Sequence, residues 1–329
     1  MTDVSKNDKN FAPKDNIDNA TIASYNVREC EAFKIYGVYH DSKQYRRIPA
    51  ELAEATSKGV VEHSTRTAGG RVRFKTNSPY IAIKAILPEF NHMAHMPPSG
   101  STGFDCYIDG RYAGSFIPHA TETVDCFERV INNPNGEKVC EVQINFPLYN
   151  GLSELYVGLH KDARVEPPEP YEYPVPVVFY GSSITQGGCA SRPGMSYQAI
   201  LSRDLNFDYI NLGFSGSAKG EKPMVEYLAS LDMSVFVMDY DHNAPNPEHL
   251  EKTHKPLFDA VREKHPDIPI IMLSRPRYYL TDDHVRRREI IKKTYEAALA
   301  AGDEKVYFID GQTLYSGSSD LLPVEAPRL

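Results

Sequence analysis

A run of prolines divides the chain into two parts with different residue patterns. Residues 166–176 read Glu-Pro-Pro-Glu-Pro-Tyr-Glu-Tyr-Pro-Val-Pro. Proline has no backbone N–H and a restricted φ, so this run excludes a helix and a central strand and indicates a stiff, extended connector. A chain of 329 residues is also long for a single core. We therefore expect two folded parts, residues 26–165 and 177–329, joined by a connector of residues 166–176.

The part before the connector contains short strand patterns and little helical periodicity. Runs rich in Val, Ile, Tyr and Phe cover residues 34–39, 72–76, 80–87, 104–108, 139–146 and 155–159. Asp109-Gly110 separates residues 104–108 from residues 111–116, which predicts a hairpin. Many short strands divided by turn residues are typical of an antiparallel β-sandwich, here of jelly-roll type.

After the connector, strand and helix patterns alternate. Apolar runs occur at residues 177–180, 209–212, 235–238, 268–273 and 306–309. The segments between them have helical spacing, with one apolar face formed by Leu250, His254, Leu257 and Val261 and another by Val285, Ile291, Ala298 and Leu299. This alternation predicts an α/β unit, in which helices cover a parallel sheet.

Composition limits the location and the partners of the protein. Residues 1–25 begin with a stretch rich in Asn, Asp and Lys, which predicts a disordered lead-in and no secretory signal. No apolar run is long enough to cross a membrane, and a net charge of −8 argues against general affinity for nucleic acid or an anionic membrane. Five scattered cysteines without a signal peptide favour reduced thiols and a cytoplasmic location.

Ser183 follows the first apolar run of the α/β part. It stands in Gly181-Ser182-Ser183-Ile184-Thr185, at the carboxyl end of a predicted strand, where open α/β sheets present their functional groups. A hydroxyl at that edge can act as a nucleophile if a base reaches it. The alternative is a serine-rich loop whose hydroxyls cap the next helix.

Two further loops after consecutive strands carry groups suited to acyl transfer. In Asn211-Leu212-Gly213-Phe214-Ser215-Gly216-Ser217, backbone N–H groups can stabilise an oxyanion. In Asp241-His242-Asn243-Ala244-Pro245, the carboxamide of Asn243 can donate to the same oxyanion. Each loop alone could be a structural turn, but their order after successive strands favours one shared site.

These three segments resemble the motifs of the SGNH (GDSL-like) hydrolase superfamily. The resemblance implies a flavodoxin-like sheet, Ser183 as nucleophile, and an oxyanion hole formed by the backbone N–H groups of Ser183 and Gly216 and by Asn243. It implies no cofactor and no metal. Ser182 stands where the family usually has Asp, and Asp241 and Ala244 also replace usual residues. The preceding part resembles the N-terminal β-sandwich of a subfamily considered to act on acylated carbohydrates.

The final block of the family, Asp-x-x-His, does not follow Asp310, and no histidine occurs after His284. We therefore expect either that this sequence is cut short at its C-terminal end or that the protein lacks a working triad. Among other histidines, His242 lies in the expected cleft, His254 lies on an apolar helical stripe, and His284 opens a helix as a cap or surface residue. Asp310 has no neighbouring histidine to orient, so none of these residues is an attractive base.

His92 and His95 invite a metal-site interpretation because they are three residues apart, but no second cluster with ligand spacing accompanies them, and a loop role is favoured. The expected function is thus a serine esterase that removes a small acyl group, such as acetyl, from a carbohydrate or a similar small-molecule ester. The alternative is an inactive carbohydrate-binding protein without the triad base. The sequence leaves the oligomeric state open.

Overall fold

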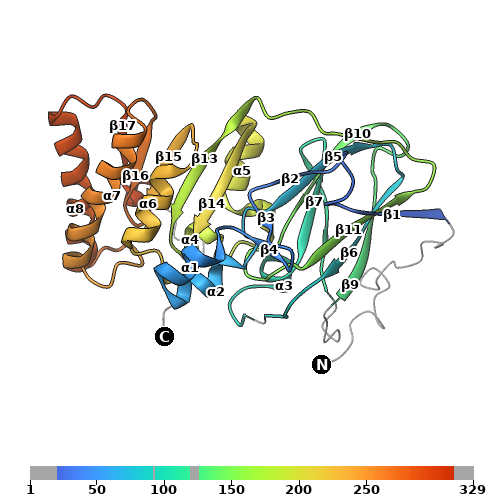
Figure 1. Cartoon of the computed structure of the whole chain (residues 1–329), viewed down its shortest axis with the longest axis horizontal. Helices are drawn as coiled ribbons and strands as arrows, with labels where there is room; N and C mark the ends of the chain where they lie inside the picture. Colours follow the sequence, from blue (N-terminus) through green and yellow to red (C-terminus); the bar gives the residue numbers. More distant parts are fainter. Residues whose placement is uncertain (1–20, 92, 119–125, 315–329) are drawn as a thin grey trace.

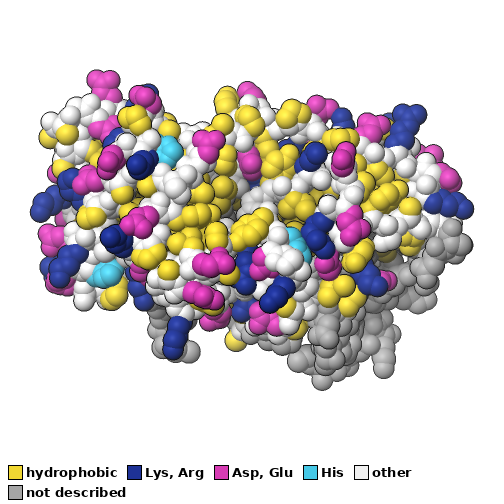
Figure 2. All heavy atoms as spheres, viewed as in Figure 1, with side chains coloured by type: hydrophobic (Ala, Val, Ile, Leu, Met, Phe, Trp, Pro, Cys, Tyr) yellow, Lys and Arg dark blue, Asp and Glu magenta, His cyan; other side chains and the backbone are white. Residues whose placement is uncertain are grey.

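The structure, a computed structural model, describes residues 21–91, 93–118 and 126–314. Figure 1 shows two adjoining parts, with antiparallel strands on one side and a parallel sheet with helices on the other. Figure 2 shows acidic and basic side chains interspersed on the viewed face, which therefore carries no extended patch of one charge. No helix in the described ranges is long and apolar enough to cross a membrane.

Two antiparallel sheets form the first part. The four-stranded sheet has the order β1 (Ile22–Asn26), β11 (Glu154–His160), β6 (Tyr80–Ile86), β9 (Cys126–Asn132). The other has the order β12 (Val165–Glu166), β5 (Arg71–Thr76), β10 (Cys140–Asn145), β7 (Phe104–Ile108), β8 (Arg111–Phe116), with β2 (Lys34–Tyr36) also paired to β5. Side chains of both sheets, such as Ile83 and Val142, share one core. The predicted β-sandwich is confirmed.

Short elements complete this part: β3 (Tyr39–His40), β4 (Tyr45–Arg46) and α3 (Pro98–Ser101). The predicted hairpin is confirmed, since β7 and β8 pair across Asp109 and Gly110. Both turn residues have positive φ, 49° and 75°, as a type I′ turn requires.

The second part contains the predicted parallel sheet. Its order is β14 (Phe207–Gly213), β13 (Tyr173–Gly181), β15 (Val235–Asp239), β16 (Ile270–Leu273), β17 (Val306–Ile309). The first strand in the sequence thus lies between the second and the third, which is the flavodoxin-like order. This order brings the carboxyl ends of β14, β13 and β15 side by side.

Helices cover both faces of this sheet because successive side chains of a strand point in opposite directions. Val178 and Tyr180 point to the face packed by α6 (Lys222–Ser230), α7 (Pro247–Lys264) and α8 (Asp282–Ala300). Val177 and Phe179 point to the other face, which α5 (Tyr197–Leu205) covers. The remaining short helices are α4 (Ser183–Gln186), η4 (Pro193–Met195) and η5 (Gly311–Leu314).

The predicted apolar face of α7 is confirmed, since all four of its residues are buried. The predicted face of α8 is only half right: Ile291 and Ala298 are buried, whereas Val285 and Leu299 are exposed. At about 100° per residue, Val285 lies about 120° from Ile291 and Leu299 about 100° from Ala298. The predicted face therefore combines two sides of the helix.

Both expected boundaries shift. β13 begins at Tyr173, inside the expected connector, although Pro174 and Pro176 belong to it. The register with β14 is irregular between Tyr173 and Val177, and pairing with β15 begins only at Val177. The prolines therefore lie in the irregular first residues of the strand, where no backbone N–H is required for pairing. The expected lead-in of residues 1–25 also overlaps β1, because pairing with β11 starts at Ile22; residues 1–20 lie outside the described residues.

Two helices of the first part belong to the core of the second. α1 (Ala50–Thr56) and α2 (Lys58–Ser64) were not predicted, since each has only seven residues, about two turns. Ala53 and Val60 are buried in the core of the parallel sheet, with Leu212 and Phe214. In Figure 1 these helices lie beside α4, below the parallel sheet.

Arg71 of β5 joins the two parts. Its guanidinium is fully buried, forms an ion pair with Asp208 at the start of β14, and donates to the carbonyl of Tyr209 at 3.2 Å. It also lies 4.0 Å from the centre of the Tyr209 ring and donates to the Tyr171 hydroxyl at 2.8 Å. A buried cation is tolerated only when paired and hydrogen-bonded in this way.

We expect Arg71→Met to lower the free energy of unfolding by about 3–5 kcal/mol, because it strands Asp208 and two carbonyl acceptors. Urea unfolding followed by circular dichroism measures this loss. Lys75→Met is the matched control: Lys75 lies on the same strand but pairs with Glu169 on the surface, so we expect little change. A loss below about 1 kcal/mol for Arg71→Met would contradict the assigned role.

Candidate active site

The three expected site residues lie at the carboxyl edge of the parallel sheet. Ser183 is the first residue of α4, two positions after the end of β13. Gly216 lies in the loop after β14, and Asn243 lies in the turn after β15. Because β13 pairs with both β14 and β15, the three loops are neighbours.

The two adjacent serines differ in their contacts. Ser182 is the N-cap of α4, and its hydroxyl accepts a hydrogen bond from the N–H of Ile184 at 3.2 Å. Within the described part of the chain, the Ser183 hydroxyl has no hydrogen-bond partner. The capping role and the proposed nucleophile role are thus divided between neighbours. Gly181 is required for close packing rather than for a left-handed turn, since a Cβ there would lie 2.4 Å from the Asp239 carbonyl oxygen.

The peptide groups of Phe214 hold the three loops together. Its N–H donates to the Gly181 carbonyl at 2.9 Å, at the end of β13. Its carbonyl accepts from the Asn243 side-chain amide at 2.8 Å and from the Ser217 N–H at 2.9 Å. A carboxamide has two N–H bonds, so one remains for another acceptor. Gly216 is exposed and has a φ of 66°, which glycine adopts readily.

The β-sandwich part contacts the Ser183 segment through residues that no sequence motif predicts. The Tyr149 hydroxyl donates to the Ser183 carbonyl at 3.1 Å. The side chain of Gln186 donates to the Leu148 carbonyl at 3.2 Å and accepts from the Ser215 N–H at 2.9 Å. Leu148 and Tyr149 lie in no strand or helix and belong to no recognised motif. Their position beside Ser183 therefore follows from the tertiary structure alone.

Arg47 binds the end of β14, next to the loop that contains Gly216. This buried guanidinium donates to the carbonyls of Asn211 and Gly213 at 3.1 and 2.5 Å, and lies 4.7 Å from the centre of the Phe214 ring. Helix α2 approaches the same loop so closely that a Cβ at Gly59 would lie 2.1 Å from the Ser217 hydroxyl. Residues of the first part thus position a loop of the second.

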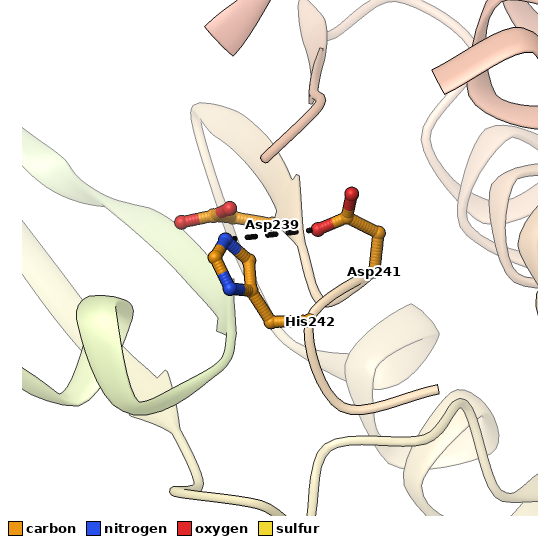
Figure 3. Close-up of side chains that lie close together, drawn as sticks. All are labelled: Asp239, Asp241 and His242. Carbon is orange, nitrogen blue, oxygen red and sulfur yellow. Dashed lines mark ion pairs between the residues drawn. The ribbon is translucent and has the colours of Figure 1, made fainter. Parts of the chain in front are cut away.

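Three polar side chains cluster at the end of β15 and in the turn after it. Figure 3 shows the imidazole of His242 beside the carboxylates of Asp239 and Asp241. One ligand-type atom from each lies within 4.8 Å of the others, and this is the one group of that kind within the described residues. Arg275 donates through its backbone N–H to Asp241 at 3.1 Å and through Nε to His242 at 2.9 Å. A fixed guanidinium at this distance opposes a bound cation.

Burial raises the pKa of both carboxyls, and their mutual repulsion adds to the shift at Asp239. The pKa of Asp239 rises to about 7 and that of Asp241 to about 6. The Thr185 hydroxyl donates to Asp239 at 2.9 Å and so favours the charged form, but burial has the larger effect on the pKa. The Asp239 carboxyl therefore titrates near neutral pH.

No histidine hydrogen-bonds to Ser183 within the described ranges. Nδ1 of His242 accepts from Arg275, and its Nε2 lies 3.9 Å from Asp241. His254 is buried beside Thr294, where desolvation lowers its pKa to about 3, so its expected core role is confirmed. His284 caps α8 in a capping box with Thr281, also as expected.

The other residues considered as candidates form no hydrogen bond with Ser183 among the described residues. Asp310, after β17, forms an ion pair with Arg288 at 3.2 Å. His95 is exposed, whereas His92 lies outside the described residues. The five cysteines form no disulfide with one another.

Comparison with known proteins identifies the family. Residues 175–323 match the family model of the GDSL-like lipase/acylhydrolase family, and residues 23–165 match the model for the N-terminus of SGNH-hydrolase-type esterases. A candidate GDSL-like lipase from Bacteroides ovatus is 31% identical, with a TM-score of 0.78, over 88% of this chain and 87% of the other. The chain belongs to the GDSL-like lipase/acylhydrolase family. It is therefore an SGNH-type esterase with a preceding β-sandwich.

Other proteins of known structure share the fold of this GDSL-like protein at lower identity. A salicylyl-acyltransferase from a tetracycline biosynthetic pathway is 20% identical, with a TM-score of 0.76, over 93% of this chain and 90% of the other. A family two carbohydrate esterase from Clostridium thermocellum, in complex with cellohexaose, is 16% identical, with a TM-score of 0.59, over 84% and 88%. No curated protein sequence matches the chain.

The raised pKa values predict a pH-dependent stability. A carboxyl whose folded pKa lies above its unfolded value stabilises the protein at low pH, and this contribution is lost as the pH rises through the folded pKa. For Asp239 the loss extends from about pH 4 to about pH 7. We expect Asp239→Asn to be more stable than the parent at pH 8, on the order of 2 kcal/mol, and similar to it at pH 4.

Urea unfolding at both pH values measures this difference. Asp232→Asn, at an exposed position before β15, is the control and should leave the pH dependence unchanged. An Asp239→Asn protein with the same pH dependence as the parent would show that this carboxyl is not the group that titrates.

Proposed function

We propose that the protein hydrolyses an ester of a small acyl group, such as acetyl, on a carbohydrate, with Ser183 as nucleophile. The observation that carries the proposal is the pair of hydrogen bonds made by Phe214, to Gly181 and from Asn243, which join the loops after three neighbouring strands. The exposed Gly216 and the Ser183 hydroxyl then lie at the same edge of the parallel sheet. This hydroxyl has no hydrogen-bond partner among the described residues.

In this mechanism the Ser183 oxygen attacks the ester carbonyl while a general base accepts its proton. The N–H groups of Ser183 and Gly216 and the second amide N–H of Asn243 stabilise the tetrahedral oxyanion. Collapse breaks the ester bond, and the proton leaves with the alcohol. Water then attacks the acyl-serine, which releases the acid and restores the hydroxyl. None of these steps uses a cofactor.

The substrate class is supported by proteins that share the fold. They include the carbohydrate esterase bound to cellohexaose and an acetyl xylan esterase from Butyrivibrio proteoclasticus, which is 14% identical over 88% of this chain and 90% of the other, with a TM-score of 0.55. The shared fold supports the acetylated-glycan substrate by analogy.

We expect Ser183→Ala to abolish hydrolysis of p-nitrophenyl acetate and acetylated xylo-oligosaccharides, because the acyl acceptor is lost. Asn243→Ala should lower kcat by about 10² to 10³ with little change in KM, since its amide acts on charge that develops in the transition state. Steady-state kinetics measure both effects. Activity of Ser183→Ala equal to that of the parent would refute the assignment.

One observation favours a second candidate, a carbohydrate-binding protein with an impaired triad. No histidine contacts Ser183 in the described part: His242 accepts from Arg275, and His254 lies beside Thr294. Without a base the serine hydroxyl is a weak nucleophile, and the rate falls by several orders of magnitude.

A fluorophosphonate probe separates these functions, because it reacts rapidly only with an activated serine. We expect the parent protein and Ser182→Ala to be labelled and Ser183→Ala to remain unlabelled. Ser182→Ala removes only the cap of α4, at a cost of about 1 kcal/mol in stability. Glycan binding without labelling of the parent would favour the second candidate.

A further inference from the structure

A cavity lies between the two parts, remote from the carboxyl edge of the parallel sheet. It has a volume of about 130 Å³, and its walls include Arg73 and Tyr107 from the sandwich, Tyr171 from the connector, and Arg203 and Asn206 from α5 and its end. Asn206 directly precedes β14, so the cavity adjoins the amino edge of the sheet, opposite Ser183. Its volume is several times what one water molecule needs.

The Arg203 side chain makes no hydrogen bond or ion pair within the described part of the chain, and the nearby charged group is the Asp105 carboxyl. Its guanidinium lies 4.0 Å from the centre of the Tyr107 ring, and Nη1 is buried without a hydrogen bond. The ring stabilises the cation through its face but accepts none of the N–H groups in the guanidinium plane. Buried donors left unmet are costly, and an arginine held in this way is prepared for an acceptor.

Arg73 faces the same cavity with a second unmet donor. Only 5% of this residue is exposed, and its guanidinium lies 4.0 Å from the centre of the Tyr171 ring. Nε donates to Glu141 at 3.0 Å and Nη2 pairs with the same carboxylate, whereas Nη1 is buried without a partner. The cavity is thus lined by two guanidinium groups and one carboxylate, Glu141, which leaves one net positive charge.

We propose that this cavity binds a small oxyanion with one negative charge, held between Arg203 and Arg73. Carboxylate and phosphate oxygens match the planar N–H groups of guanidinium, and such charge-assisted bonds are the strong ones. A single negative charge balances the net charge of the walls, and the Glu141 carboxylate disfavours a second one. Because Arg73 belongs to β5 and Arg203 to α5, the ion would bridge the two parts.

Thermal unfolding in sodium acetate or sodium phosphate, against sodium chloride at equal ionic strength, tests this site. We expect a saturable rise in Tm of about 5 °C at about 100 times Kd with at least one oxyanion. Arg203→Gln should weaken binding at least about tenfold, and Arg203→Lys should have an intermediate effect because it keeps the charge without the fork. Arg286→Gln removes the same charge from an exposed site on α8 and should bind as the parent does.

The response to each anion identifies the ligand: acetate alone indicates a carboxylate, and phosphate alone indicates a phosphate group. Ser183→Ala should bind as the parent does, so this test is independent of the esterase assignment. The proposal would be overturned if neither anion gave a saturable rise in Tm, or if Arg203→Gln showed the same rise in Tm as the parent. Crystals grown in saturating phosphate and acetate that hold only water between Arg73 and Arg203 would also overturn it.

Discussion

The arrangement of the candidate site depends on the peptide groups of Phe214. Hydrogen bonds from and to this residue connect the end of β13, the loop after β14 and the turn after β15. The Phe214 ring is fully buried, and the guanidinium of Arg47 lies against it. Side-chain packing thus fixes the position of a backbone carbonyl, and that carbonyl fixes the orientation of the Asn243 amide. Preorganisation of this kind is what oxyanion stabilisation requires.

The two parts of the chain are mutually dependent. Helices α1 and α2 precede most strands of the sandwich in sequence, yet they complete the core of the parallel sheet. Arg47 and Arg71 carry buried charges from the first part to carbonyl groups of the second. The sandwich also supplies Tyr149, which contacts the peptide of Ser183. A division at the prolines describes the order of patterns along the chain but not the boundaries of the two cores.

Local patterns predicted most strands of both parts, but not β1, β9 or β12. Residue composition and the Asp109-Gly110 turn predicted β7 and β8 to the residue, and apolar runs located all five parallel strands. The loops with Ser183, Gly216 and Asn243 were predicted to be neighbours because they follow consecutive strands. Long-range contacts could not be predicted: Arg71 meets Asp208 and Tyr149 meets Ser183 only through the fold. Prolines misled the assignment of the connector, since a strand tolerates them where its N–H groups are unpaired.

The buried contacts of Arg71 have a mechanical consequence. A hinge between the two parts would have to move this guanidinium away from Asp208 and the Tyr209 ring, and so expose a charge and its partners in separate environments. Such motion is far more costly than rotation about an ordinary polar interface between domains. The contact between Tyr149 and the Ser183 peptide is therefore held in one arrangement. We expect the sheet edge that carries Ser183 to keep this shape when a ligand binds.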